Sequence, residues 1–271
     1  MKLIPIFLLV GVFAVSGWAK DAEPESYSPK LVKKAEAGNV LAQLYLGDCY
    51  LFGNGVTQDY KEAVKWYTKS AEKGNANAQY RLGYIFRLEG DTLDYNEAIK
   101  WFTKSAEQGN ARAQWELGAF YDQGKGVTQD YKEAVKWYTK SAEKGYGSAQ
   151  LNLGIHYYMG QGVTQDYKEA VKWYKKLAEQ EVIEGGSDGK NLLGKCYFEG
   201  KGVTQDYKEA VKWYTKSAMS GDGEGQTLLG WCYANGTGVP KDEKLAIVWF
   251  EKAAELGYPE AKEALEKLKS K

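Results

Sequence analysis

Two Ser-x-x-Lys sequences, Ser70 to Lys73 and Ser141 to Lys144, are the residues of this chain that come nearest to a catalytic motif. In penicillin-recognising enzymes the serine of such a motif is a nucleophile. The companion sequences Ser-Asp-Asn and Lys-Thr-Gly are absent here. Each serine also lies near the expected end of a helix that recurs along the chain. We therefore expect no catalytic residue.

The only histidine, His156, offers a single candidate base to a serine or cysteine nucleophile. It takes a helix position that Cys49, Ile85 and Phe120 occupy elsewhere, which predicts a semi-buried packing residue. No cysteine and histidine spacing suits zinc. The run from Gly185 to Lys190 lacks the spacing of a phosphate-binding P-loop. We expect no enzyme activity, no metal and no cofactor.

The three cysteines, Cys49, Cys196 and Cys232, share one position in the expected helices. Neighbouring helices pack about 8–10 Å apart, whereas a disulfide needs α-carbons within roughly 7 Å. We expect buried thiols, with a strained bridge between Cys196 and Cys232 left open as an alternative.

Charged residues balance, with 36 basic and 36 acidic side chains. Proteins that bind nucleic acid usually carry a basic excess, so we expect no such partner. Lys61, Lys65 and Lys69 form a stripe that recurs in later copies. It could make weak contact with an anionic envelope surface, or it could be a solvated face balanced by acidic neighbours such as Glu62.

A repeated sequence organises the chain. Gly-Val-Thr-Gln-Asp-Tyr-Lys-Glu-Ala-Val-Lys-Trp-Tyr begins at Gly55, Gly126, Gly162 and Gly202. Six tryptophans are separated by 35, 36, 36, 40 and 36 residues: Trp66, Trp101, Trp137, Trp173, Trp213 and Trp249. A period of this length predicts a solenoid, in which each unit buries its apolar face against its neighbours.

Each unit is expected to be a pair of helices. In the first unit Ala42 and Leu46 lie on one face of the first helix, which Gly53 ends. Asp59 caps the second helix, and Glu62 is expected to complete a capping box. Helices of about 12 residues are marginal alone in water, so packing between units must stabilise them.

A glycine recurs in the middle of every first helix, although it costs roughly 1 kcal/mol relative to alanine. The set is Gly47, Gly83, Gly118, Gly154, Gly194 and Gly230. This pattern predicts a helix crossing too tight for a methyl group. A leucine at Gly118 is expected to disrupt the stacking on both sides.

The pattern Ala-x-x-x-Leu-Gly-x-x-Tyr, then Gly-x-Gly-Val-x-x-Asp, then Ala-x-x-Trp-x-x-Lys-Ser-Ala runs from Ala42 to Ala71. It resembles the Sel-one-like repeat (SLR) family, a branch of the tetratricopeptide-like (TPR) helical repeats, from Ala35 to about Leu256. The resemblance implies an all-α, right-handed solenoid of six antiparallel helix pairs with first helices on the concave side. It also implies a scaffold or adaptor for proteins. Cysteine-rich secreted relatives are linked to β-lactam binding, which leaves that or a hydrolase activity as an alternative.

Two units depart from the pattern. The second has Glu89 to Leu93 in place of the Gly-x-Gly-Val turn, and four extra residues fall within Glu181 to Ser187. We expect a local bend or a protruding loop at these places.

The chain begins with the features of a secretory signal over residues 1–19: Lys2, an apolar run to Val15, and a small-residue exit with cleavage near Ala19. An uncleaved anchor is the alternative, and no later segment is expected to enter a membrane. We assign residues 20–34 to a tail and capping helix, 35–256 to six repeats and 257–271 to a C-terminal capping helix. The predicted location is the periplasm or the exterior of the cell.

One face of the first helices varies between units, whereas the opposite face repeats. The candidate partner-binding residues on the varying face are Tyr80, Tyr84, Arg87, Trp115, Asp122, Tyr158, Lys195, Phe198 and Trp231. Aromatic and arginine side chains dominate interface hot spots, which favours a groove for protein partners. The alternative is that these residues fill contacts between adjacent first helices. We predict an exported, non-catalytic scaffold whose partner and oligomeric state the sequence does not identify.

Overall fold

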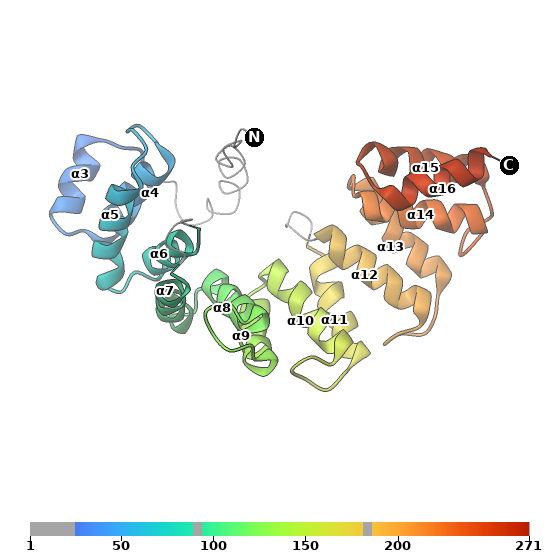
Figure 1. Ribbon diagram of the computed structural model, residues 1–271, viewed down its shortest axis with the longest axis horizontal. Coiled ribbons are helices and arrows are strands. Elements are labelled where there is room, and N and C mark those ends of the chain that lie inside the picture. The colour runs from blue at the N-terminus through green and yellow to red at the C-terminus, as the bar shows by residue number, and fades with distance from the viewer. Residues whose placement is uncertain (1–24, 89–93, 181–185, 271) are drawn as a thin grey trace, which may run out of the picture. The chain divides into compact units, whose positions relative to one another are not determined.

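The computed structural model describes residues 25–88, 94–180 and 186–270, and within these ranges it contains fourteen helices and no strand (Figure 1). The chain folds as two compact units, residues 1–117 and 118–271. The prediction of an all-α fold built from helix pairs is confirmed. The predicted signal and both expected irregular segments lie wholly or mostly outside the described residues.

In the part of the chain that the structure describes, six first helices alternate with six second helices, with one further helix before them and one after them. The first helices are α4 (Val40–Phe52), α6 (Ala76–Leu88), α8 (Ala111–Gln123), α10 (Gly147–Met159), α12 (Gly186–Glu199) and α14 (Gly223–Asn235). The second helices are α5 (Tyr60–Glu72), α7 (Tyr95–Glu107), α9 (Tyr131–Glu143), α11 (Tyr167–Ala178), α13 (Tyr207–Met219) and α15 (Glu243–Glu255). The end helices are α3 (Pro29–Glu36) and α16 (Pro259–Lys269).

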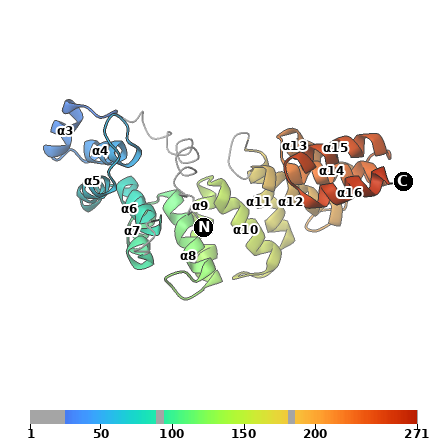
Figure 2. The ribbon, with the colours of Figure 1, turned by 45° about the horizontal axis from the view of Figure 1, so that its top comes forward.

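Consecutive helices pack side by side from α3 to α7 and from α9 to α16. In the C-terminal part, α14 packs on α15 and α15 on α16, and both views show the three together (Figures 1 and 2). Ser28 caps α3, because its Oγ accepts a hydrogen bond from the Leu31 N–H at 3.1 Å. No helix in the described part of the chain has the length and apolar character that crossing a bilayer requires.

At the start of the second helix α5, only one of the two interactions of the predicted capping box is present. Asp59 Oδ1 accepts hydrogen bonds from the N–H groups of Lys61 and Glu62 at 2.9 and 3.1 Å. The Glu62 carboxylate does not reach back and instead accepts from Lys65. The reason is that the Asp59 N–H already donates to the carbonyl of Tyr50 at 2.9 Å. The prediction of a full capping box was therefore wrong, and the cap ties the second helix to the first.

The second glycine of the Gly-x-Gly turn brings one repeat against the backbone of the preceding one. Gly162 has φ +72°, and a Cβ placed there would lie 2.2 Å from the carbonyl oxygen of Tyr131, the first residue of α9. Gly202 and Gly238 approach Tyr167 and Tyr207 in the same way. Only a residue without a side chain fits, so this glycine fixes the spacing of neighbouring repeats.

The central glycine of each first helix lies against a buried aromatic ring of its own second helix. A Cβ at Gly118 would lie 2.5 Å from Tyr138 Cδ1. Equivalent contacts pair Gly47 with Tyr67, Gly83 with Phe102, Gly154 with Tyr174, Gly194 with Tyr214, and Gly230 with Phe250. The predicted crossing too tight for a methyl group is confirmed. Its partner is the second helix of the same repeat, so the tight contact lies within one repeat.

Gly118→Ala is expected to lower the thermal midpoint and cost about 1–3 kcal/mol of stability, because the added methyl group meets the Tyr138 ring. This loss should appear although alanine favours a helix by roughly 1 kcal/mol over glycine. Calorimetry or circular dichroism melting measures it. In a Tyr138→Leu background the same change should be nearly neutral or stabilising. An equal loss in both backgrounds would show that the ring is not the cause.

Candidate functional site

The exposed part of the varying face lies on the C-terminal first helices, where α10 packs on α12 and α12 on α14. Phe198 and Trp231 are 37% and 41% exposed, and Lys195, three residues before Phe198 on α12, is also exposed. Each ring rests edge-on against a ring of its own second helix: Phe198 on Tyr207 at 5.1 Å and Trp231 on Phe250 at 5.4 Å between centroids. Both aromatic side chains are therefore held in place and still accessible.

The N-terminal candidates are less exposed. Tyr80 is 7% exposed and packs against the Phe102 ring, with centroids 5.8 Å apart, so it supports the face from beneath. Tyr84 is half-buried, and the Arg87 guanidinium lies 5.1 Å from its ring centroid. Trp115 is half-buried on α8. Here the varying residues serve partly as packing, as the alternative interpretation holds.

Hydrogen-bonded or charged contacts join each repeat to the next, and we call them junction pairs. In the first junction, Arg81 Nε donates to Asp48 Oδ1 at 2.9 Å, and the Tyr67 hydroxyl donates to the same carboxylate oxygen at 2.6 Å. Burial, together with the charge of Asp48, raises the pKa of Tyr67 well above its usual value. The phenol therefore stays protonated and can donate.

The second junction again pairs a guanidinium with a carboxylate, and the third to fifth use other groups. Arg87 Nη1 lies 3.4 Å from Glu116 Oε2, and Asp122 Oδ1 lies 3.4 Å from His156 Nε2. The Tyr158 hydroxyl donates to Glu199 at 3.0 Å. At the fifth junction, Asn191 Nδ2 on α12 donates at 2.7 Å to Oδ2 of Asp222, the residue that caps α14. Several predicted site residues thus hold neighbouring repeats together, which sequence reasoning offered only as the alternative.

His156 does more than pack. It is 2% exposed, rather than semi-buried as the sequence predicted, and Nδ1 lies 2.9 Å from the carbonyl oxygen of Gln161. Its other ring nitrogen faces Asp122, whose Oδ2 also lies 3.4 Å from the Tyr138 hydroxyl. The imidazole is enclosed by structural partners, so no nucleophile approaches it within the described residues.

The Ser-x-x-Lys residues are not arranged for catalysis. Ser70 and Ser141 are both 0% exposed. Ser70 Oγ donates to the Val40 carbonyl at 2.8 Å, and Lys73 Nζ reaches the Gly38 carbonyl at 2.6 Å. A substrate cannot reach these two hydroxyls in this fold.

The cysteines are free and buried, so the bridge left open between Cys196 and Cys232 is absent from this structure. Burial raises the pKa of Cys49, Cys196 and Cys232 to about 11 each. Protonated thiols are poor nucleophiles and poor metal ligands. Within the described residues, no group of three or more histidine, cysteine or acidic side chains is placed to hold a metal ion.

The lysine stripe is engaged locally. Lys65 Nζ lies 2.9 Å from Glu62 Oε1, and Lys69 Nζ lies 4.1 Å from the Trp66 ring centroid. A lysine lies over the equivalent tryptophan ring in the five other repeats. Because these lysines contact acidic and aromatic neighbours, the structure favours a solvated face with balanced charge over a surface that contacts an anionic envelope.

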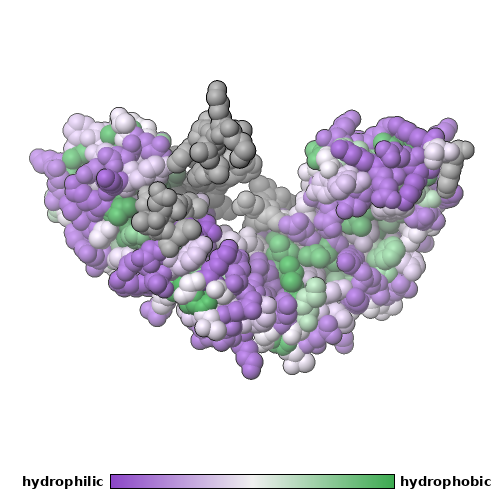
Figure 3. All heavy atoms as spheres, in the orientation of Figure 1, coloured by the Kyte–Doolittle hydropathy of each residue, from purple (hydrophilic) through white to green (hydrophobic). Residues whose placement is uncertain are grey.

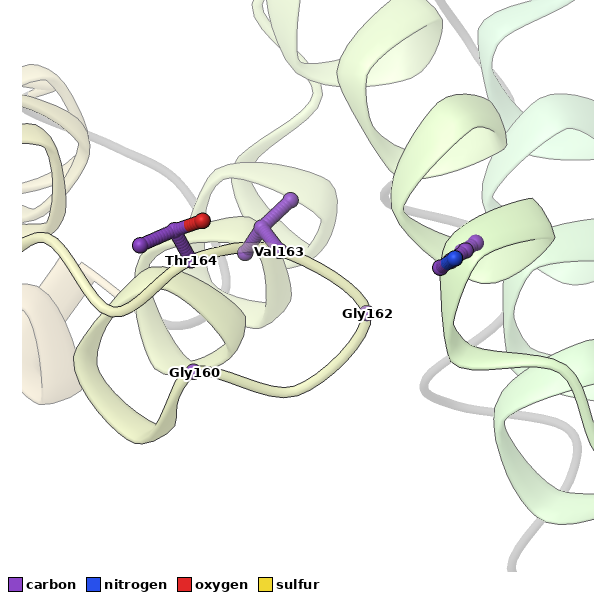
Figure 4. A pocket seen from close by; sticks show the side chains of 5 residues that line it. Gly160, Gly162, Val163 and Thr164 are labelled. Carbon is purple, nitrogen blue, oxygen red and sulfur yellow. The ribbon is translucent and has the colours of Figure 1, made fainter.

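A shallow hollow of about 520 Å³ opens beside the turn after α10 (Figure 4). Its lining consists of Lys132, Gly160, Gly162, Val163 and Thr164. The lining provides backbone groups, the ammonium group of Lys132 and the hydroxyl group of Thr164. No side chain among these five residues could act as a base for that hydroxyl. Figure 3 shows hydrophobic atoms, in green, in separate small areas among hydrophilic ones. The arrangement suits a contact surface better than an enclosed substrate site.

Six consecutive segments match the Sel1 repeat family, and each corresponds to one helix pair. They are residues 40–75, 76–110, 111–146, 147–182, 187–222 and 223–258.

Two solved structures resemble most of the chain. The structure of c5321, a protective antigen present in uropathogenic Escherichia coli strains and displaying an SLR fold, is 40% identical with a TM-score of 0.82, over 87% of this chain and 50% of that chain. A Sel1 repeat protein from Oxalobacter formigenes is 35% identical with a TM-score of 0.74, over 88% of this chain and 68% of that one.

A curated relative matches a shorter part. The ERAD-associated E3 ubiquitin-protein ligase component HRD3A of Arabidopsis thaliana is 36% identical over 72 residues, which is 26% of this chain and 11% of that protein. The chain therefore spans a small part of this relative and half of the first similar structure.

Arg81→Met is expected to cost about 3–5 kcal/mol, because it leaves the buried Asp48 carboxylate without its charge partner. Urea unfolding measures the loss. Adding Asp48→Asn should recover a large part of it. Lys65→Met, which breaks the exposed pair with Glu62, is the matched control and should cost less than about 1 kcal/mol. Equal costs for the two single variants would contradict a buried junction pair.

Glu116→Gln is expected to change how stability depends on pH. Burial raises the pKa of Glu116 to about 6 from 4.5, although Arg87 opposes this effect. The folded chain then binds this proton more tightly than the unfolded chain, so stability falls as the pH rises between these values. The loss is on the order of 2 kcal/mol. Urea midpoints at pH 4.5 and 7 should show the fall in the wild type and a smaller one in the variant. Parallel pH profiles would contradict the assignment.

Proposed function

The chain belongs to the Sel1 repeat family, and from this premise we propose that it is an exported, non-catalytic scaffold that binds protein partners on its first-helix face. The predicted resemblance to SLR proteins is confirmed by the six matching segments and the similar solved structures. Sel1 repeat proteins generally mediate protein–protein interaction as scaffolds. The finer steps, namely export, the face used and the residues that bind, are our own proposal.

The observation that carries the proposal is a pair of exposed rings that pack on rings of their own repeats, Phe198 and Trp231. A ring already packed against its own repeat loses little conformational entropy on binding. Aromatic side chains held in this way are typical hot spots, and the surrounding polar surface suits the rim of an interface. Lys195 adds a charge on the same face of α12 as Phe198, since the two are three residues apart.

Export rests on the sequence of residues 1–19, whose charge, apolar run and small-residue exit are those of a secretory signal. The similar chain from uropathogenic Escherichia coli is described as a protective antigen, which agrees with a place outside the cytoplasm. We propose the periplasm or the cell exterior as the location, with cleavage near Ala19.

A variant with Phe198→Ala and Trp231→Ala is expected to lose its protein partner in a pull-down from host envelope and culture-medium extracts. Truncating hot-spot aromatics typically costs about 2 kcal/mol or more each, enough to abolish capture. Circular dichroism should first show that the variant is folded, and mass spectrometry then compares the captured proteins.

A second variant is the matched control, with Tyr60→Ala, Val248→Ala and Leu256→Ala. These exposed side chains belong to second helices or their ends. The control should keep the partner that the first variant loses. If both variants keep it, the first-helix face is not the binding site.

A further inference from the structure

The turn between α4 and α5 carries a reactive dipeptide that the equivalent turns lack. Asn54 is followed by Gly55, whereas the other Gly-x-Gly-Val turns have lysine, glutamine or threonine at the place of Asn54. These residues are Lys125, Gln161, Lys201 and Thr237. An asparagine amide is most open to attack by the next backbone nitrogen when glycine follows, because glycine has no side chain to shield that nitrogen. The first repeat therefore differs from its copies in the chemistry of this turn.

Both reacting groups of the turn are accessible. Asn54 and Gly55 are exposed. Within the described residues, neither the Asn54 side chain nor the Gly55 N–H has a hydrogen-bond partner. The Asn54 backbone is nevertheless fixed, since its N–H donates to the Cys49 carbonyl at 3.0 Å. The nitrogen that would attack is thus unengaged, and so is the side-chain amide of the residue before it.

Asn235 and Gly236 form the other Asn-Gly sequence of the chain, and there both groups are engaged. Asn235 is the last residue of α14, and its Nδ2 donates to the Trp231 carbonyl at 3.0 Å. Gly236 caps this helix, and its N–H donates to the Cys232 carbonyl. Both hydrogen bonds must break before the Gly236 nitrogen attacks. Because Asn235 is exposed as well, hydrogen bonding rather than exposure distinguishes the two sites.

The turn at Asn54 also supports the segment of residues 25–27. A Cβ placed at Gly55 would lie 3.2 Å from Tyr27 Cβ. The neighbouring Cys49 is 2% exposed, and its thiol donates to the carbonyl of Glu25 at 3.4 Å. A change in backbone length at residue 54 would therefore shift the surface on which this segment rests.

We propose that Asn54 is a site of spontaneous deamidation, and that its conversion to isoaspartate loosens residues 25–27 from the first repeat. The Gly55 nitrogen gives its proton to hydroxide and forms a bond to Asn54 Cγ. The bond from Cγ to Nδ2 breaks, and Nδ2 leaves as ammonia. Water then opens the cyclic imide at either carbonyl, which gives aspartate or isoaspartate. Overall one water is consumed and one ammonia is released, with no oxidation or reduction.

The isoaspartate product changes the turn in two ways. Its backbone passes through Cγ and is longer by one methylene group, which displaces Gly55 from Tyr27. It also adds a negative charge at residue 54, because a carboxylate replaces a neutral amide. This inference concerns the first repeat alone and does not rest on the proposed function.

The test compares the two Asn-Gly sites within one protein. The wild-type chain is incubated at mildly alkaline pH, and mass spectrometry of its peptides follows the replacement of each amide by a carboxyl. In the folded chain Asn54 is expected to convert about tenfold faster than Asn235, a barrier difference of about 1.4 kcal/mol. In concentrated urea the two rates should be similar, because the hydrogen bonds of Asn235 are then absent. Equal rates in the folded chain would overturn the inference.

A second measurement follows the contact with residues 25–27. Ion exchange separates the converted chains, since each carries one more negative charge. In chains with isoaspartate at residue 54, the Cys49 thiol is expected to react with iodoacetamide about tenfold faster, because the segment that covers it opens more often. Cys196 and Cys232 are internal controls and should keep their reactivity. An unchanged rate at Cys49 would overturn the loosening of the segment.

Asn54→Gln is the matched control variant. Glutamine already stands at the equivalent place of the fourth repeat, as Gln161, so the turn accepts it. Its side chain is longer by one methylene group, and closure of the larger ring is slower. The variant should show neither the mass change at residue 54 nor faster labelling of Cys49 after the same incubation. Faster labelling of Cys49 in this variant would mean that the opening has another cause, and would contradict the proposal.

Discussion

The close approach of a helix backbone to an aromatic ring is the contact on which the repeat depends. Gly118 and Tyr138 show it: the ring occupies the place that a Cβ would take, and five other repeats make the same contact. This contact leaves little freedom to the ring or to the glycine: the ring is a tyrosine in four repeats and a phenylalanine in two. First-helix positions outside the contact vary between repeats.

Those variable positions perform two tasks. Some, such as Asp48 and Asn191, join one repeat to the next through hydrogen bonds or charges. Others, such as Phe198 and Trp231, remain exposed while resting against rings of their own repeat. A rigid frame beneath exposed aromatic side chains is what a scaffold needs, because recognition then costs little ordering of the protein itself.

Local signals could be predicted from the sequence, whereas long-range partners could not. The repeat, the cap at Asp59 and the tight crossing at Gly118 each depend on residues close in sequence or repeated at a fixed period. The contact of Asp48 with Arg81 joins residues 33 apart, and a pattern does not give the rotation of each helix that brings them together. Because the rotation of each helix is not given by the pattern, the sequence also could not distinguish Tyr80, which is buried, from Trp231, which is exposed.

The junction pairs also bear on how such an array can evolve. Nearly identical second-helix sequences invite unequal recombination, which would delete, duplicate or reorder repeats. The boundaries, however, do not all use the same pair: a carboxylate meets a guanidinium at the first and second, an imidazole at the third, and an amide at the fifth. A reordered array would place unlike groups together and bury some of them unpaired. The groups on the first helices therefore restrict which repeats can be neighbours. Selection for the fold then also preserves the order of the repeats.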